Sequence, residues 1–402
     1  MRQPYYTTNL NLLKHRFAYA EGICYNYNVD LCVIGRYSAA WLFGYRQLMK
    51  GFQMKIVVLC GGRSPERDVS VSTGAMVASA LRSRGHYVAV VDSCADYYLE
   101  PESCFTLEDN DNVNAVISES APDGDFAPGA KEQFFGKGVI DICRYADIVF
   151  NAMHGAAGED GTLQATFDLL GIRYTGSSAK GCMLAMDKLL TKQIFAMIPQ
   201  AVRMPRGAVL RREAYEKDGL PSGLDTLGRP LVIKPVSGGS SVGVSIVETD
   251  KELLKALKLA FKYEDRVLIE EHISGREFSV GILGDVVLPA IEIKPKSGFY
   301  DYSNKYQAGA TEEICPADID RDTSIRMQRM AGFVYAGLSL SVYARVDFIM
   351  NEKGIIYCLE ANTLPGMTNM SLLPQEAAAA GIDFATLCQR IIDESMKKYD
   401  RA

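Results

Sequence analysis

The most constraining feature of the chain is a continuous apolar run at residues 56–59, which a glycine-rich loop follows directly. A strand that is apolar at every position is typical of a parallel sheet, where helices cover both faces. The next stretch predicts a helix that is capped by Asp68 or Ser70 and runs through Leu81. A second apolar run at residues 88–91 predicts another strand. The pattern is a βαβ unit, so we expect a parallel sheet at the start of the fold.

The second half of the chain has a different pattern of strands. Short apolar stretches alternate with turns between residues 230 and 293, which indicates an antiparallel or mixed sheet. Helices are expected at about 179–197, 323–338, 375–380 and 384–398. The two patterns together predict a mixed α/β (α+β) protein.

Composition narrows the classes of function. The formal net charge of −6 argues against the broad basic surface of a nucleic-acid-binding protein. The sequence has no run of apolar residues long enough for a membrane-spanning helix. The ten cysteines form no CxxC pair and several stand in apolar runs, which indicates reduced, mostly buried thiols of a cytosolic protein. The four histidines are scattered and do not predict a zinc site.

Residues 1–53 differ from the rest of the chain. They carry six Lys or Arg residues, two acids and the only tryptophan, Trp41. Such a composition can belong to a targeting peptide, but the order of regions in a secretory signal is missing. We therefore expect the core fold to begin at Met54, with residues 1–53 as an extension of unknown role or a stretch upstream of the true start.

Two strands joined by a turn at residues 351–354 carry a cluster of oxygen-bearing side chains. Asp347 lies on the first predicted strand, and Glu360 and Asn362 lie at the end of the second. Alternate residues of a strand point to one face, so a hairpin can bring the three together. Two carboxylates and an amide oxygen suit Mg²⁺ completed by phosphates and water. Arg345 shares the face of Asp347, where a guanidinium could neutralise developing charge. Solvated acids on a hairpin would give the same pattern.

A loop rich in glycine and serine, residues 237–243, follows a predicted strand that ends near Lys234. Backbone N–H groups of such a loop can surround a phosphate, and a lysine can reach it as a point charge. The loop lacks the Gly-Lys-Ser/Thr ending of a P-loop, and its composition also suits a flexible turn. Glu270 and Glu277, on the strands that follow, could accept hydrogen bonds from a nucleotide or be surface acids. These residues alone leave both interpretations open.

The order of these parts is more specific than any one of them. From Met54 to about Tyr399 the chain resembles the D-alanine–D-alanine ligase family, which has the ATP-grasp fold. The stretches that carry the resemblance are GGRSPERDVS, NAMHGAAGEDGTLQ, GIRYTGSS, MDKLLTK, IKPVSGGSSVGVS, EEHISGREFSVGIL, GFYDYSNKYQAG, RVDFIM and LEANTLPGMTNMSLLP. The resemblance implies three parts after the extension at 1–53: a βαβ substrate-binding domain at 54–178, a central ATP-grasp subdomain at 179–269, and a C-terminal subdomain at 270–402 with a mobile ω-loop and the metal site.

The resemblance also implies an ATP site and a metal site. Lysines would contact the phosphates and the strand acids would hold the adenine and the ribose. The expected ATP-binding residues are Lys188, Lys234, Ser241, Glu270 and Glu277. Two Mg²⁺ or Mn²⁺ ions would be bound by Asp347, Glu360 and Asn362.

In the family, ATP phosphorylates the carboxylate of a first D-alanine, and the amine of a second D-alanine attacks the acyl phosphate. The catalytic residues that the resemblance implies are Glu66, His154, Ser240, Lys305, Tyr306, Arg345 and Ser371. Glu66 would pair with the ammonium of the first D-alanine, and His154 would lie near its carboxylate. The alternatives are a helix-terminal acid and a hydrogen-bonded loop histidine.

The remaining implied roles concern the lid and the second substrate. Ser240 would link Glu66 to Tyr306, and Lys305 would meet the phosphoryl group from the ω-loop, which excludes water. Arg345 and the backbone around Gly366 would stabilise the tetrahedral oxyanion. The second D-alanine would be contacted by Ser371 and Leu372.

The nearest alternative is a ligase of the same fold with D-serine or D-lactate as its second substrate. Lactate-using relatives are expected to carry histidine in place of Tyr306, so this tyrosine favours an amine nucleophile. A non-catalytic nucleotide-binding protein is disfavoured because the expected lysines and metal ligands are present. The family implies ATP and D-alanine as partners, a homodimer, and a cytoplasmic role in making the peptidoglycan precursor. We expect no nucleic-acid or membrane partner.

Overall fold

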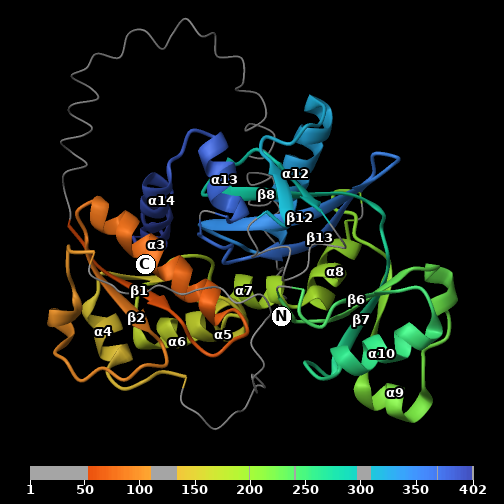
Figure 1. Ribbon diagram of the computed structural model, residues 1–402, viewed down its shortest axis with the longest axis horizontal. Helices are drawn as coiled ribbons and strands as arrows, with labels where there is room; N and C mark the ends of the chain where they lie inside the picture. Colours follow the sequence, from red (N-terminus) through yellow and green to blue (C-terminus); the bar gives the residue numbers. More distant parts are fainter. Residues whose placement is uncertain are drawn as a thin grey trace, which may run out of the picture. The chain divides into compact units, whose positions relative to one another are not determined.

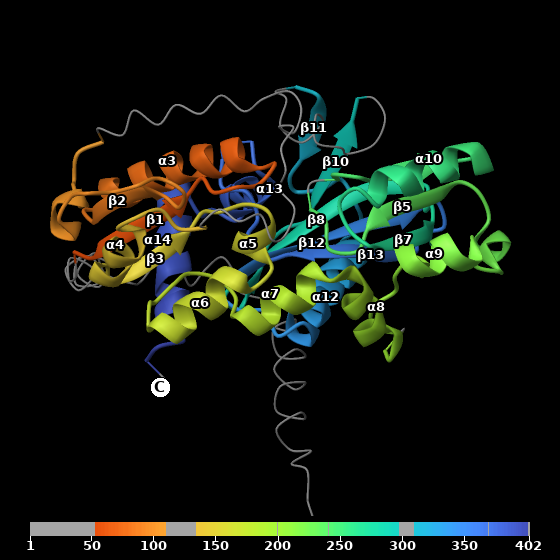
Figure 2. The ribbon, with the colours of Figure 1, turned by 90° about the horizontal axis from the view of Figure 1, so that it is seen from below.

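The computed structural model of the protein describes residues 53–109, 134–198, 200–239, 241–296, 309–368 and 370–400. All helices and strands given below belong to one compact unit, Met54–Ala402. These residues form three sheets with helices packed on them (Figure 1, Figure 2).

The first sheet is parallel, which confirms the βαβ prediction. Its middle strand, β1 (Lys55–Cys60), lies between β2 (Tyr87–Asp92) and β3 (Ile148–Asn151). The apolar run of β1 is fully buried, as expected for a strand covered on both faces.

The helix that connects β1 to β2 is α3 (Arg67–Ser83), and Glu66 is its N-cap residue. The predicted cap at Asp68 or Ser70 is therefore wrong. Ser70 lies inside the helix, where its Oγ accepts a hydrogen bond from the Gly61 N–H and donates one to the Ala152 carbonyl. The other elements around this sheet are η1 (Pro101–Cys104), α4 (Val139–Tyr145), α5 (Ala156–Glu159) and α6 (Thr162–Leu170).

The helix predicted at 179–197 is two helices, α7 (Ala179–Met186) and α8 (Lys188–Ala196). They are separated at Asp187, whose backbone is extended and whose side chain accepts a hydrogen bond from the Leu190 N–H. An aspartate that caps a helix in this way satisfies an N–H group that the helix itself leaves without a partner. As a result, α8 begins at Lys188, one of the expected ATP residues.

The second sheet is antiparallel, with the strand order β4-β7-β5-β6. Helix α10 packs on β5 and β6 and begins with a capping box formed by Thr249 and Glu252. The elements of this part are β4 (Gly207–Arg211), α9 (Arg212–Asp218), η2 (Leu224–Leu227), β5 (Leu231–Pro235), β6 (Ser245–Val247), α10 (Asp250–Ala260) and β7 (Arg266–Glu271).

The third sheet has the order β11-β10-β8-β12-β13, with β9 paired to β8. Val280 on β8 packs in a core with α12, whereas the neighbouring Gly281 meets α13, so the two helices lie on opposite faces (Figure 2). The elements are β8 (Gly275–Leu283), β9 (Val286–Val287), β10 (Ile291–Pro295), β11 (Thr311–Ile314), α12 (Arg321–Gly337), β12 (Tyr343–Asn351), β13 (Ile356–Asn362), α13 (Leu372–Ala379) and α14 (Phe384–Met396).

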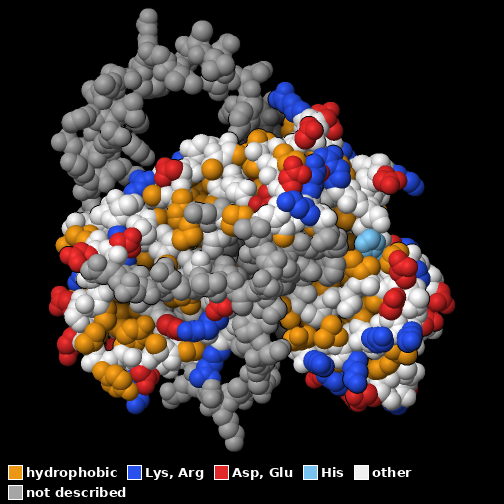
Figure 3. Space-filling view, in the orientation of Figure 1, with side chains coloured by type: hydrophobic (Ala, Val, Ile, Leu, Met, Phe, Trp, Pro, Cys, Tyr) orange, Lys and Arg blue, Asp and Glu red, His pale blue; other side chains and the backbone are white. Residues whose placement is uncertain are grey.

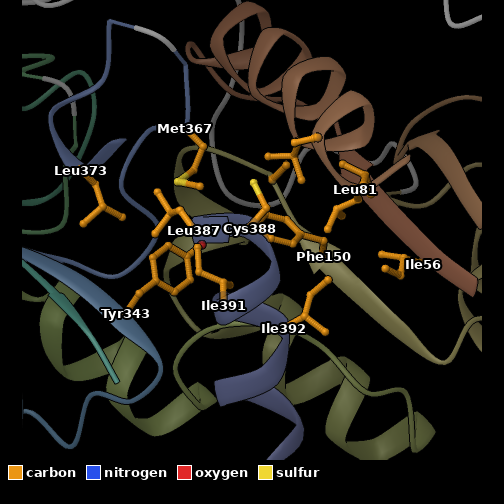
Figure 4. Close-up of a cluster of buried hydrophobic side chains, with 14 of the residues drawn as sticks. Ile56, Leu81, Phe150, Tyr343, Met367, Leu373, Leu387, Cys388, Ile391 and Ile392 are labelled. Carbon is orange, nitrogen blue, oxygen red and sulfur yellow. The ribbon is translucent and has the colours of Figure 1, made fainter. Parts of the chain in front are cut away.

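One hydrophobic core joins the two ends of this unit. Figure 4 shows Ile56, Leu81 and Phe150 of the first sheet region beside side chains that follow β12 in the chain. The latter come largely from α14, which packs on α3 (Figure 1). The α14 members of this core are Leu387, Cys388, Ile391 and Ile392.

The surface and the cysteines bear on the sequence predictions. On the described part of the face drawn in Figure 3, acidic and basic side chains are interspersed. Eight cysteines lie in the described ranges, and five of them are buried. None of the helices described in the structure is long and apolar enough to cross a membrane.

Candidate active site

The β12–β13 hairpin brings the predicted metal ligands together. Asp347 lies directly opposite Glu360, and Arg345 lies opposite Asn362. The register shifts next to Asp347, so that Leu359 has no partner across the strands and forms a β-bulge. Without this bulge, Glu360 would lie on the apolar face with Cys358. The bulge therefore turns Glu360 to the face that carries Asp347.

The carboxylate of Asp347 is held by two neighbours on this face of the sheet. Arg345 donates two hydrogen bonds to it, from Nε to Oδ1 at 2.9 Å and from Nη2 to Oδ2 at 2.8 Å. Ser279 on β8, which is fully buried, donates a third to Oδ1 at 2.8 Å. Ser279 was not predicted, because a lone serine in an apolar strand carries no recognisable signal.

Lys188 connects the hairpin to the glycine-serine loop. Its Nζ lies 3.2 Å from Glu360 Oε2 and donates to the Gly238 carbonyl at 2.5 Å. An expected phosphate-binding lysine and an expected metal ligand are therefore neighbours. This closeness is required where metal ions bridge nucleotide phosphates.

Two lysines share the carboxylate of Glu270. Lys234 Nζ lies 2.6 Å from Oε2, and Lys192 contacts Oε1. Burial alone would raise the pKa of Glu270, but Lys234 and Lys192 lower it below its usual range. Burial likewise disfavours the Lys234 ammonium, yet Glu270 keeps the pKa of this lysine raised. Lys192 lies one turn after Lys188 on α8, a helical spacing that could have identified it.

Partly buried polar groups also fix the glycine-serine loop. The Ser237 N–H donates to Glu264 Oε2 at 2.6 Å, and Arg266 contacts Glu264 at 3.0 Å. Arg266 Nη1 also donates to Asp187 Oδ2 at 2.9 Å. Arg266 thus ties the loop to the residue that caps α8. Ser241, at the end of the loop, has a positive φ of 59°.

Glu277 lies on β8 of the third sheet, opposite Ile293 of β10 and Ile349 of β12. Glu270 belongs to the second sheet, so the two expected adenine and ribose acids come from different sheets. Ligand sites often lie between such parts of a protein, so acids from two sheets could contact one ligand.

The expected first-substrate residues meet at the carboxyl ends of β1 and β3. Glu66 is 7% exposed, and its Oε2 lies next to both Gly155 and Gly239 of the glycine-serine loop. Its side chain makes no capping hydrogen bond to α3, and it lines the pocket described below. His154 is buried beside it, with Nε2 3.0 Å from Thr73 Oγ1 and Nδ1 3.5 Å from Glu159 Oε1.

The expected second-substrate residues lie where α13 begins. Ser371 Oγ accepts a hydrogen bond from the Thr368 N–H at 3.0 Å and lies 2.9 Å from Thr368 Oγ1. A Cβ on Gly366 would lie 2.6 Å from Ser371 Oγ, so this turn needs a residue without a side chain. Ser371 therefore packs against the backbone of Gly366, which was expected to face the oxyanion.

One pocket joins these groups. It is lined by nine of the residues singled out from the sequence: Glu66, His154, Lys188, Arg345, Glu360, Asn362, Gly366, Ser371 and Leu372. Glu159 and Thr363 also line it and were not predicted. Lys234, Ser241, Glu270, Glu277 and Asp347 are not among its lining residues. Ser240, Lys305 and Tyr306, with the rest of the ω-loop tip, lie outside the described residues, so their roles stay predictions.

The hairpin residues fit a divalent metal by their chemistry. Asp347 and Glu360 offer carboxylate oxygens on one face, and Asn362 follows two residues later. Within the described ranges, no group of three His, Cys, Asp or Glu side chains forms a metal cluster. The donor set is therefore an incomplete, hard-oxygen one, of the kind that Mg²⁺ uses when phosphate and water supply the rest.

Comparisons with known proteins identify the family of the chain. Two family models match the chain: "D-ala D-ala ligase N-terminus" over residues 55–177 and "D-ala D-ala ligase C-terminus" over residues 203–393. A D-alanine–D-alanine ligase of Pediococcus pentosaceus is 41% identical over 356 residues, which cover 86% of this chain and 99% of the relative.

Solved structures are similar as well. A D-alanine–D-alanine ligase from Bacillus anthracis complexed with ATP has a TM-score of 0.67 and 30% identity, covering 87% of this chain and 99% of that chain. VanG, a D-Ala:D-Ser ligase from Enterococcus faecalis, has a TM-score of 0.66 and 29% identity, covering 86% and 100%. Fold and site define an enzyme of the ATP-grasp class. The chain belongs to the D-alanine–D-alanine ligase family.

Proposed function

We infer that the protein joins two D-alanine molecules into D-alanyl-D-alanine, with the conversion of ATP to ADP and phosphate as the driving reaction. The observation that carries this conclusion is a pocket whose lining includes Glu66, Lys188, Glu360 and Ser371. It combines side chains suited to bind an amino acid with a lysine and an acid suited to bind nucleotide phosphates and their metal ions. The family match supports the same reaction.

The proposed reaction has two steps. A carboxylate oxygen of the first D-alanine attacks the γ-phosphorus, and the bond to ADP breaks. The amine of the second D-alanine then attacks the acyl carbon, loses a proton, and phosphate leaves. The protein needs little covalent chemistry of its own, because its task is to hold charges and orient the reactants.

Three residues that line the pocket have proposed roles in binding the amino acids and stabilising charge. Glu66 pairs with the ammonium of the first D-alanine, since its buried carboxylate already lies between two glycine backbones. Arg345 faces the reacting carboxyl group and stabilises the oxyanion. Ser371 binds the carboxylate of the second D-alanine from the first turn of α13, where N–H groups favour an anion.

Metal binding is part of the proposal. Asp347, Glu360 and Asn362 would hold Mg²⁺ or Mn²⁺, two ions per site. When bound, these ions neutralise the triphosphate and orient its terminal phosphoryl group. Lys188 and Lys234 supply further positive charge on the same side.

The setting of the reaction is also proposed from the family. We expect a homodimer that works in the bacterial cytoplasm and supplies the D-Ala-D-Ala end of the peptidoglycan precursor. D-Serine or D-lactate as the second substrate remains the competing specificity, and the VanG likeness makes D-serine the one to test.

The first experiment is ADP release by the purified full chain with ATP and Mg²⁺, in the presence of D-alanine, D-serine or D-lactate, with products identified by mass. D-Alanine alone should support ADP release and give the dipeptide. Glu360→Ala should lower kcat by about a hundredfold or more, the size typical of losing one group that stabilises transition-state charge. Glu352→Ala, at the exposed turn of the same hairpin, is the matched control and should be active. Equal activity of the two variants would refute the metal site.

A further inference from the structure

Glu376 is a fully buried carboxyl group that the proposed reaction does not use. It lies on α13, one turn after Leu372, and accepts a hydrogen bond from the Gly281 N–H at 3.0 Å through Oε1. Its second oxygen, Oε2, has no hydrogen-bond partner among the described residues. A buried polar atom without a hydrogen-bond partner lowers the stability of the folded protein, so the presence of Glu376 needs an explanation.

Gly281 supplies a backbone donor that the sheet leaves free. Its carbonyl accepts a hydrogen bond from the Leu288 N–H, which continues the β8–β9 ladder. The matching Leu288 carbonyl accepts a hydrogen bond from Gln328 Nε2, and Pro289 follows. The Gly281 N–H would therefore be buried without a partner, and Glu376 supplies one.

The contact between α13 and β8 is too close for a side chain on Gly281. A Cβ there would lie 2.6 Å from Glu376 Oε2 and 2.5 Å from Leu373 Cδ1. Gly281 is also the cross-strand partner of Arg345 on β12. Glu376 therefore occupies the space over Gly281, directly beside the guanidinium of the site.

Burial favours the neutral form of Glu376. Burial raises the pKa of Glu376 well above the usual range, Arg345 and the Gly281 N–H lower it, and Asp347 raises it. Burial also raises the pKa of the Cys315 thiol, before α12, which is close enough for Glu376 to raise that pKa further. A neutral carboxyl fixes the helix without competing for the charge of Arg345.

We propose that Glu376 is a positioning residue for the second substrate: by bonding the Gly281 N–H it fixes the first turn of α13, with Ser371 and Leu372, beside Arg345. This inference rests on the proposed function, in which Ser371 binds the carboxylate of the second D-alanine. Glu376 does not touch substrate and acts only through the position of this turn.

The test compares Glu376→Gln with Glu376→Leu in the full chain. Glutamine is isosteric with the neutral acid and keeps the acceptor for Gly281, whereas leucine fills the space without it. Rates measured over a wide D-alanine range at saturating ATP give the Michaelis constants of the two D-alanine sites. We expect Glu376→Leu to raise KM for the second D-alanine at least fivefold and to leave KM for the first D-alanine and for ATP within twofold of the wild-type values. Glu376→Gln should keep the wild-type values of all three constants.

Three outcomes would overturn the proposal: an unchanged second KM in the leucine variant, an equal loss in every constant, or a glutamine variant as impaired as the leucine one. Gly281→Ala gives a second route if the leucine variant does not fold, since it displaces the same turn and should raise the same constant. Circular dichroism at each step reports folding. Wild-type protein that makes no dipeptide would refute the proposed function itself, and is thus distinct from a failure of the Glu376 proposal.

Discussion

Replacing Glu270 by glutamine would leave two buried ammonium groups without their shared anion. Lys192, Lys234 and Glu270 have side chains only 15%, 11% and 5% exposed. Removing one partner from a buried ion pair costs about 3–5 kcal/mol, because the remaining charge stays desolvated. At about 2 °C per kcal/mol for a chain of this size, we expect Tm to fall by roughly 6–10 °C at pH 7.

The neighbouring residue offers a matched control. Glu271 pairs with Arg206, whose side chain is 65% exposed, so Glu271→Gln should cost no more than about 1 kcal/mol. Thermal unfolding of both variants, followed by far-ultraviolet circular dichroism, makes the comparison. The deficit of Glu270→Gln should also shrink as pH rises, because an unpaired ammonium can lose its proton. Equal Tm values for the two variants would refute the argument that this carboxylate compensates two buried charges.

Two further predictions concern the partly buried basic residues Arg266 and Lys398. Arg266→Met breaks the link between the glycine-serine loop and Asp187, so KM for ATP should rise about tenfold, as expected for a loss of about 1.4 kcal/mol, while KM for D-alanine stays constant. The control is Arg229→Met, at a surface ion pair with Asp250, which should change neither constant. An unchanged KM for ATP in Arg266→Met would contradict the role of this link. Burial lowers the pKa of Lys398 from 10.5 to about 8, against the opposing effect of Asp168, so between these pH values the unfolded chain binds more protons than the folded one. The free energy of unfolding of the wild type, relative to that of Lys398→Met, should therefore rise by about 3 kcal/mol from pH 8 to 10.5. When the pH is lowered, this gain is lost over the same range and is absent below pH 8. A difference that does not vary with pH, or the same trend in a comparison with the exposed Lys397→Met, would contradict it.

The sequence predicted the elements with strong local patterns. The apolar run of β1 and the alternation around Asp347 each depend on the residues' own neighbours, and both predictions were confirmed. The break at Asp187 was missed, because an apolar periodicity continues through it and only the capping bond to Leu190 separates the helices. The bulge at Leu359 was also missed, although it alone places Glu360 opposite Asp347.

The site residues that were not predicted from the sequence were missed for a common physical reason. Lys192, Ser279 and Glu376 act by filling a gap or supplying a charge to a residue distant in the chain. Apart from the helical spacing between Lys192 and Lys188, their own stretches of sequence do not indicate that partner. Glu360 could be predicted from its alternation with Asn362 on a strand. Lys188 was expected only because the stretch MDKLLTK resembles the ligase family.

The core that α14 shares with the first sheet has a consequence for how the chain is made. Side chains of β1 and α3, such as Ile56 and Leu81, pack with Leu387 and Ile391. Roughly 300 residues separate these two groups, and ribosomes add about 5–20 residues per second. The apolar face of the first sheet region that packs on α14 therefore stays unpacked for roughly 15–60 s during synthesis. The part of the protein that leaves the ribosome early is thus among the last to reach its native packing, and in that interval it is a natural client for chaperones.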